Sequence, residues 1–338
     1  MSTEIPRPYL IFLGEAVDAL DAKTGAGLAE WRPNWCAGQY RFAGGQCDLG
    51  LPDMTPSEAS AMGIKTMVIG GATFGGRLTP EWIVAIEEAI DAGLNVASGL
   101  HDRMRDNPAL VAHARDKNVL LFDVRGLPPG HRPSVATGRK RSGRRLLTVG
   151  TDCAVGKKFT ALAVERAMLA KGWAATFRAT GQTGVLISGG GVAIDAVVAD
   201  FLAGVVEDLS PDAAPDHWDI VEGQGALHHP AYAAVSLGLL HGSQPDAFIV
   251  CHDGSRQHVE GYPDFALPSV EAVIQLTIAN GCRLNPGIRC VGAAINGSKM
   301  DRDDFEALKH EIGLRIGLPV FDPAVDDLSG LLAEIDRR

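Results

Sequence analysis

A glycine-bounded loop that ends in a lysine is the part of the sequence best equipped for chemistry. The apolar residues 146–149 lead directly into the loop, and apolar residues at helical spacing follow it. The loop itself reads Gly150, Thr151, Asp152, Cys153, Ala154, Val155, Gly156 and Lys157. A strand, a tight loop and a helix start in this order place backbone N–H groups and the positive end of a helix dipole around one anion. The sequence therefore predicts a phosphate-binding loop (P-loop), although a plain strand-to-helix turn is the alternative.

Two features separate this loop from the general P-loop pattern. Five residues rather than four lie between its glycines, a spacing that resembles the loop of dethiobiotin synthetase and related ligases. Lys158 occupies the position where a Mg²⁺-binding Ser or Thr is expected, and Thr160 lies on another face of the helix turn. Because Lys158 supplies a second cation and no hydroxyl, we expect the site to bind a phosphate chain rather than to cleave one.

Further polar residues follow the predicted strands at 174–178, 220–222 and 247–251. Open parallel sheets bind ligands at the carboxyl ends of their strands, so these residues are candidates for the same site. The candidates for proton transfer are Glu222, His229 and His252, and those for substrate binding are Arg178, Gln182, Thr183, Asp195, Gln224 and Arg256. A core histidine remains the alternative for His229, and a structural role the alternative for the acidic residues of 194–201. Cys153 has no evident base partner, so we expect a small apolar filler of the loop rather than a nucleophile.

Short apolar strands alternate with helical patterns along the whole chain, which predicts an α/β protein with doubly wound parallel sheets. Strands are expected at 9–13, 66–69, 94–97, 119–123, 145–149 and 290–295 besides the three named above. Residues 126–143 interrupt this pattern with Pro, Gly and basic residues. We therefore expect a first domain at 1–130, a linker at 131–143 whose basic residues are solvated, and a second domain at 144–338.

The composition limits the class of function. The net charge of −10 argues against a nucleic-acid or anionic-membrane partner, because no basic surplus exists to neutralise a polyanion. The six cysteines have neither zinc-site nor disulfide spacing, which favours reduced thiols in a cytoplasmic protein. The first apolar stretch is too short for a signal peptide or a membrane span.

Five blocks of the sequence resemble a family long described only as a domain of unknown function, which includes D-glutamate N-acetyltransferases. The blocks are GTDCAVGKK, ATGQTG, AIDAVVADFLAG, VEGQGALHHPAY and SLGLLHGSQPDAFIVCH. The resemblance implies a Rossmann-like domain followed by a P-loop NTPase-like domain, in a homo-oligomer. It also implies acetyl transfer from acetyl-CoA to the amine of an acidic amino acid, D-glutamate, in D-amino-acid catabolism. Coenzyme A carries a pyrophosphate and a 3′-phosphate, which suit residues 150–158 and Thr160 without metal-dependent chemistry.

Two other functions compete with this one. An ATP- and Mg²⁺-dependent ligase or kinase similar to dethiobiotin synthetase fits the stretch VEGQG and Asn296 after the last strand. A non-catalytic sensor of coenzyme A or a nucleotide is the third possibility. We expect no firmly bound metal in the acetyltransferase.

Overall fold

The computed structural model describes residues 5–18, 21–127 and 132–337. It divides into two compact units, which we describe separately. The first comprises Met1–Gly130 together with Gly181–Ala196, and the second comprises His131–Thr180 together with Val197–Arg338. Within the described residues, no helix combines the length and the apolar character needed to cross a membrane.

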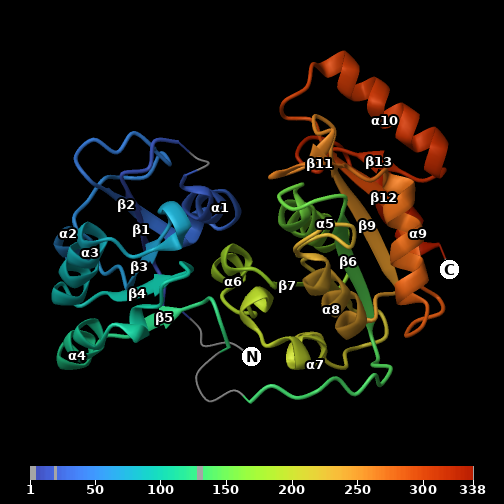
Figure 1. Cartoon of the computed structure of the whole chain (residues 1–338). Helices are drawn as coiled ribbons and strands as arrows, with labels where there is room; N and C mark the ends of the chain where they lie inside the picture. The colour runs from blue at the N-terminus through green and yellow to red at the C-terminus, as the bar shows by residue number, and fades with distance from the viewer. Residues whose placement is uncertain (1–4, 19–20, 128–131, 338) are drawn as a thin grey trace. The chain divides into compact units, whose positions relative to one another are not determined.

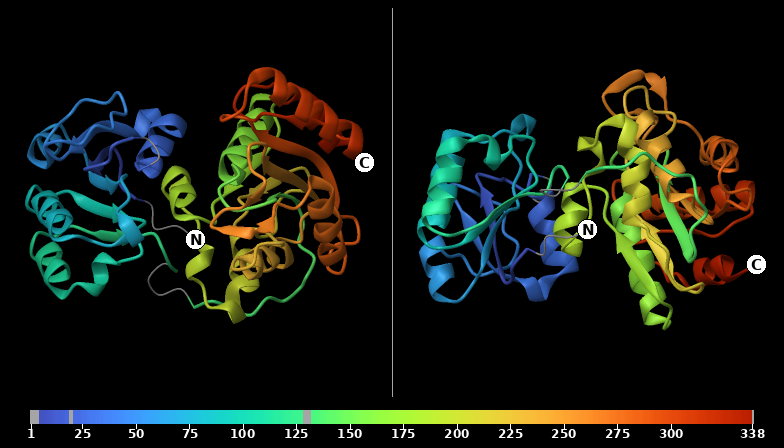
Figure 2. Two further views of the ribbon diagram at one scale, coloured as in Figure 1. Left: turned by 45° about the horizontal axis from the view of Figure 1, so that its top comes forward. Right: turned by 90° about the horizontal axis from the view of Figure 1, so that it is seen from below.

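The first unit is built on a five-stranded parallel sheet in the order β2-β1-β3-β4-β5. Its strands are β1 (Tyr9–Gly14), β2 (Cys36–Arg41), β3 (Thr66–Ile69), β4 (Asn95–Ser98) and β5 (Leu121–Asp123). On one face, α2 (Pro56–Ala61), α3 (Pro80–Asp91) and α4 (Pro108–Asp116) pack in succession over a core that includes Phe12, Met67 and Trp82. On the other face, α1 (Lys23–Trp31) contacts β1 and β3 and lies beside α6 (Gln182–Ser188) (Figures 1 and 2).

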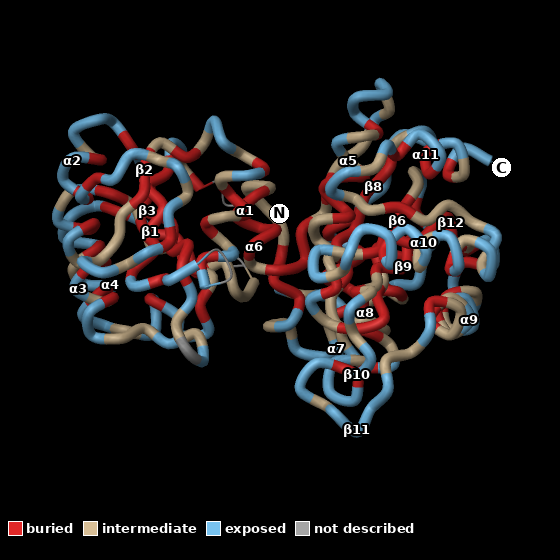
Figure 3. Tube along the Cα trace, turned by 90° about the horizontal axis from the view of Figure 1, so that it is seen from above, coloured by how far each residue is buried: buried red, intermediate tan, exposed pale blue. Residues whose placement is uncertain are grey.

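The second unit is built on a six-stranded parallel sheet in the order β13-β12-β9-β6-β8-β7. Its strands are β6 (Arg144–Gly150), β7 (Ala175–Arg178), β8 (Trp218–Val221), β9 (Ala247–Asp253), β12 (Arg289–Asn296) and β13 (Val320–Phe321). Helices α5 (Lys157–Ala170) and α11 (Ser329–Asp336) cover one face, and α7 (Ala199–Leu209), α8 (Ala233–Ser243) and α9 (Val270–Gly281) cover the other (Figure 3). Helix α10 (Arg302–Ile316) and the hairpin β10 (His258–Val259) and β11 (Tyr262–Ala266) complete the unit. The strands of both sheets are largely buried (Figure 3).

The predicted class of two doubly wound α/β domains is confirmed, but several elements were missed. Helix α1 contains two glycines and strand β2 contains one, which weakens both the helix and the strand patterns. Packing requires one of these glycines, because a Cβ on Gly25 would lie 2.8 Å from the Ile11 side chain. The stretch after Thr180 was expected as a polar loop. The segment instead forms helix α6, which includes the apolar residues 185–187.

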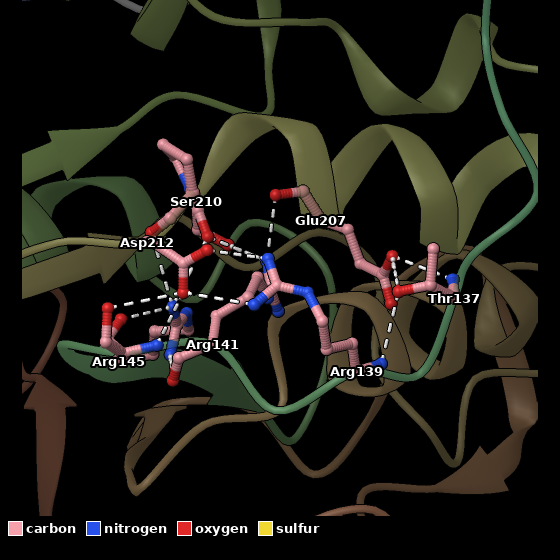
Figure 4. Close-up of polar contacts among 9 residues, drawn as sticks. Thr137, Arg139, Arg141, Arg145, Glu207, Ser210 and Asp212 are labelled. Carbon is pink, nitrogen blue, oxygen red and sulfur yellow. Dashed lines mark hydrogen bonds and ion pairs between the residues drawn. The ribbon is translucent and has the colours of Figure 1, made fainter.

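Two buried arginines, Arg141 and Arg145, lie at the end of α7 in the second unit (Figure 4). Arg141 lies in the segment expected to be solvated, yet it is only 4% exposed, so that expectation is wrong for this residue. Its guanidinium donates to the carbonyl oxygens of Glu207 (2.8 Å) and Ser210 (2.7 Å) at the end of α7, and to those of Gly242 (2.5 Å) and Ser243 (3.2 Å) at the end of α8. Helix C-termini leave such carbonyls without intrahelical partners and favour a cation.

Burial, reinforced by the neighbouring Arg145, lowers the pKa of Arg141 to about 10, so the guanidinium stays charged at neutral pH. We expect Arg141→Met to destabilise the protein by about 3 kcal/mol, because several carbonyls lose a charged donor at once. For a unit of this size, that is a fall in Tm of roughly 6–12 °C by differential scanning calorimetry. Arg139→Met is the matched control, since Arg139 pairs with Asp212 at the surface. An equal fall in both variants would contradict the role given to Arg141.

Candidate functional site

The predicted P-loop has the expected strand, loop and helix. β6 ends at Gly150 and α5 begins at Lys157, with Gly156 (φ 94°) and Ala154 (φ 53°) in the left-handed region. Lys157 is only 7% exposed, and its Nζ donates a 2.6 Å hydrogen bond to the carbonyl oxygen of Asp152 inside the loop. Burial lowers the pKa of Lys157. An anion placed in the loop would therefore stabilise the charged form of a cation that is otherwise poorly solvated.

Asp152 ties the P-loop to the segment that follows β9. Its carboxylate is fully buried, and Oδ2 accepts hydrogen bonds from Arg256 Nη1 (3.0 Å) and from the backbone N–H of Glu260 (2.8 Å). Arg256 also donates to the carbonyl oxygen of Cys153 (2.8 Å) and pairs with the carboxylate of Asp253 (3.2 Å). Arg256 was predicted to bind a substrate carboxylate. In the structure its guanidinium is engaged by the protein's own carboxylates and holds the loop in shape.

His229 lies on the other side of Asp152. Its Nδ1 accepts hydrogen bonds from the backbone N–H groups of Ala231 (3.0 Å) and Tyr232 (3.2 Å). The neutral ring therefore carries its proton on Nε2, which faces Asp152 Oδ1 at 3.7 Å. With Nδ1 occupied and Nε2 protonated, His229 is better suited to donate a hydrogen bond than to accept a proton.

Asp152, Cys153 and His229 bring three ligand atoms within 4.8 Å of one another, a grouping that could hold a metal ion. A metal on Nε2 would, however, need the proton of the ring to move to Nδ1, which two backbone N–H groups already occupy. It would also have to compete with Arg256 for Asp152. This geometry fits a hydrogen-bonded network better than a metal centre.

Glu222 follows β8 and lies next to the P-loop. Its Oε2 accepts a hydrogen bond from the backbone N–H of Thr180 (2.9 Å), and its side chain is buried. The next residue, Gly223, donates to Thr148 Oγ1 (2.9 Å). A Cβ on Gly223 would lie 1.7 Å from the Thr148 carbonyl oxygen and 3.1 Å from Lys157 Cδ. The absence of a side chain at Gly223 thus allows the end of β8, with Glu222, to pack against β6 and Lys157. Next to Gly223, the side-chain amide of Gln224 donates a 3.3 Å hydrogen bond to Thr180 Oγ1.

His252 reaches the P-loop from β9. Its Nδ1 lies 3.1 Å from Thr151 Oγ1, which is itself buried. Burial lowers the pKa of His252, an effect that Arg315 reinforces and Asp253 and Glu271 oppose. His252 is therefore neutral at pH 7. Thr160 is directed elsewhere, because its hydroxyl accepts a 3.5 Å hydrogen bond from the buried Cys251 thiol.

The lowered pKa of His252 predicts a pH-dependent stability. The unfolded histidine has a pKa near 6.5, so below that pH the unfolded state binds more protons than the folded state and stability falls. We expect His252→Gln, which retains a hydrogen-bonding side chain, to reduce the loss of Tm between pH 7.5 and 5. The exposed His258→Gln is the control, measured over the same range. Parallel curves for wild type and His252→Gln would refute the prediction.

The remaining predicted residues lie in two places. Arg178 stays in the second unit, where its Nε pairs with the buried Asp219 (2.8 Å). Gln182, Thr183 and Asp195 belong to the first unit. There Thr183 Oγ1 lies 2.9 Å from Thr24 Oγ1, and Asp195 forms an ion pair with Arg125.

An aromatic group beside the P-loop was not predicted. The rings of Tyr232 and Tyr262 lie 4.6 Å and 5.2 Å from the ring of His229, and Phe265 lies 6.0 Å from Tyr262. Tyr232 and Phe265 are about half exposed. The three aromatics come from segments that carry no regular apolar pattern, so their proximity in the structure could not be predicted from the sequence.

Comparison with known proteins places this site in a family. A P-loop domain profile described as DUF1611, a domain of unknown function, matches residues 134–332, and its Rossmann-like N-terminal counterpart matches residues 36–127. The chain belongs to the DUF1611 family. A crystal structure of a DUF1611 protein from Anabaena variabilis is 30% identical, with a TM-score of 0.86 over 98% of this chain and 99% of that chain.

Two curated relatives of the chain carry the name D-glutamate N-acetyltransferase. The protein from Tritonibacter scottomollicae is 46% identical over 319 residues, which cover 94% of this chain and 95% of that protein. The protein from a Pseudoalteromonas species is 44% identical over 332 residues, with 98% and 99% covered. At this identity and coverage, the DUF1611 protein described here is an enzyme of the acyltransferase class.

Proposed function

We propose that this enzyme transfers the acetyl group of acetyl-CoA to the amine of D-glutamate, and that its P-loop binds the phosphates of coenzyme A. The relatives named for this activity match nearly the full length of the chain. The observation that carries the proposal for the donor is Lys157, a buried cation enclosed by a loop at a helix start.

The residues around the loop favour binding of phosphates over their hydrolysis. Lys158 takes the position of the hydroxyl that would hold Mg²⁺, and the hydroxyl of Thr160 is bonded to Cys251. Coenzyme A needs cations and N–H groups for its phosphates and no attack on phosphorus. The half-exposed aromatics Tyr232 and Phe265 add apolar surface near the loop, suited to stacking with a base.

Acetyl transfer requires a base for the ammonium group of D-glutamate. In the proposed reaction, Glu222 takes a proton from the ammonium, and the free amine attacks the thioester carbonyl carbon. The C–N bond forms and the C–S bond breaks. The nitrogen loses its second proton to the departing sulfur, so the products are the N-acetyl amino acid and the free thiol of coenzyme A, and Glu222 releases the first proton to solvent. The buried carboxylate of Glu222 at the end of β8 supports this role, as does the tautomer of His229, which leaves that ring a donor.

Calorimetry with acetyl-CoA and with ATP plus Mg²⁺, combined with a thiol-release assay in the presence of D-glutamate, tests the proposal. We expect acetyl-CoA to bind and free thiol to appear only when D-glutamate is added. ATP binding with Mg²⁺ and no binding of acetyl-CoA would instead favour a ligase or kinase. Binding of acetyl-CoA without turnover of D-glutamate or any other acidic amino acid would favour a sensor.

A further inference from the structure

A polar pocket lies wholly within the first unit. It has a volume of about 280 Å³ and opens where β3 and β4 end, at Ile69, Gly71, Gly99 and Leu100. The start of α1, at Lys23 and Thr24, forms another wall. The P-loop, Glu222 and His252 all belong to the other unit, and none of them lines this pocket.

The position of the pocket in the sheet is one that binds ligands in other open α/β folds. From β1 the chain passes through α1 to β2 on one side, and it then returns to β3 on the other side of β1. The order of the strands therefore reverses at β1, and the crevice beyond the carboxyl ends is the usual place for a ligand. The turn after β1 reads Gly14, Glu15, Ala16 and so lacks the repeated glycines of a dinucleotide fingerprint. A smaller ligand than a dinucleotide fits this sheet.

The side chains that line the pocket favour an anion. The polar ones are Lys23, Thr24, Thr73, His101, Arg125 and Gln182. Among the described residues that line it, none carries a carboxylate, although the chain has 41 acidic residues against 31 lysines and arginines. Two cationic residues and several residues with neutral donors therefore line a small space in which no described lining residue carries a carboxylate.

The two cationic side chains, Arg125 and Lys23, differ in how far the protein's own groups hold them in place. Arg125 is only 11% exposed at its side chain, pairs with Asp195 outside the pocket wall, and donates to the Gly99 carbonyl oxygen at 3.3 Å. It is thus fixed in position. Within the part of the chain that the structure describes, no carboxylate pairs with Lys23, which leaves its ammonium group available to a ligand.

We propose that this pocket binds a small dicarboxylate, the chemical class of D-glutamate and its N-acetyl derivative. Lys23 would supply the mobile charge, Arg125 the fixed one, and Thr73 and Gln182 neutral hydrogen bonds. Only the choice of D-glutamate as the probe rests on the proposed function. The pocket itself follows from the geometry of the first unit.

The test uses calorimetry on the full-length protein with D-glutamate, N-acetyl-D-glutamate, glutarate and inorganic phosphate as separate probes. Lys23→Glu reverses the mobile charge at the first residue of α1, where an acidic residue favours the helix. Ala72→Phe adds bulk at a second lining residue. Lys65→Glu makes the same charge change at an exposed lysine of the same unit outside the pocket.

We expect at least one dicarboxylate to bind the wild type and Lys65→Glu alike, and to bind Lys23→Glu and Ala72→Phe roughly tenfold more weakly or worse. Unchanged dicarboxylate affinity in both pocket variants would overturn the proposal. So would binding of phosphate that depends on Lys23 together with no binding of any dicarboxylate.

The outcome separates this inference from the proposed function. If the wild type binds a dicarboxylate in a Lys23-dependent manner but transfers no acetyl group, the pocket stands and the proposed function fails. If the wild type acetylates D-glutamate while both pocket variants keep the wild-type KM and dicarboxylate affinity, the proposed function stands and the pocket fails.

Discussion

Lys157→Met should weaken the binding of acetyl-CoA by roughly 100-fold, because a phosphate in the loop would lose its buried cationic partner. Met keeps the length of the side chain and removes the charge. In the free protein that charge is poorly solvated, since burial lowers the pKa of Lys157 and its Nζ contacts one loop carbonyl. Replacing it with an apolar group should therefore keep the Tm of the free protein or raise it.

The combination of lost ligand affinity and retained stability is what distinguishes a binding role from a structural one. Lys171→Met, at the other end of the same helix, is the matched control, because Lys171 is exposed and lies over the ring of Trp173. Isothermal titration with acetyl-CoA measures both variants beside the wild type. Equal affinity in all three proteins would show that the P-loop does not hold the donor.

The parts of the molecule that the sequence predicts well are those with a local physical cause. Residues 144–157 contain an entire strand, a loop and a helix start, so the P-loop can be predicted from adjacent residues alone. Glu222 follows the buried strand β8 and His252 lies near the carboxyl end of β9, and parallel pairing brings the carboxyl ends of those strands to one edge. The local order of the chain is sufficient to place both residues near the loop.

The parts that it predicts poorly depend on distant segments. Asp152 is held by Arg256 and by the backbone of Glu260, about a hundred residues away, in a turn without a periodic pattern. Residues 181–196 belong to the first unit because α6 packs on the Gly-rich α1. The residues around position 181 carry no pattern that would predict this contact. Arg141 is buried because two helix ends converge on it, whereas a cluster of basic residues ordinarily indicates a solvated segment.

The general base cannot be assigned from the sequence alone, because the choice among its candidates depends on contacts with distant segments. Glu222, His229 and His252 are equivalent as residues that follow a strand, and only their hydrogen bonds separate them. Nδ1 of His229 is occupied by two backbone N–H groups, and His252 shares its Nδ1 with the Thr151 hydroxyl. Glu222 accepts a hydrogen bond from the backbone N–H of Thr180 at Oε2, and its carboxylate is an acceptor at any pH at which it is ionised. This ranking leads to the second prediction.

Glu222→Gln should lower kcat by about 10²- to 10⁴-fold at neutral pH, the range attributed to a positioned general base. The amide is isosteric and can still accept the hydrogen bond from the Thr180 N–H, so the affinity for acetyl-CoA and the Tm should change little. Steady-state kinetics from pH 6.5 to 10 provides the sharper readout. As pH rises, the amine of D-glutamate loses its proton to solvent, and the rate of the variant should approach that of the wild type.

His229→Gln is the comparison for this experiment, because the ring that it removes lies near the same loop but presents a protonated Nε2. We expect it to cost less in kcat than Glu222→Gln and to show no recovery at high pH, since a lost hydrogen-bond donor is not replaced by hydroxide. A Glu222→Gln enzyme with wild-type kcat and an unchanged pH profile would remove Glu222 as the base. His252, the neutral histidine at the end of β9, would then be the residue to replace next.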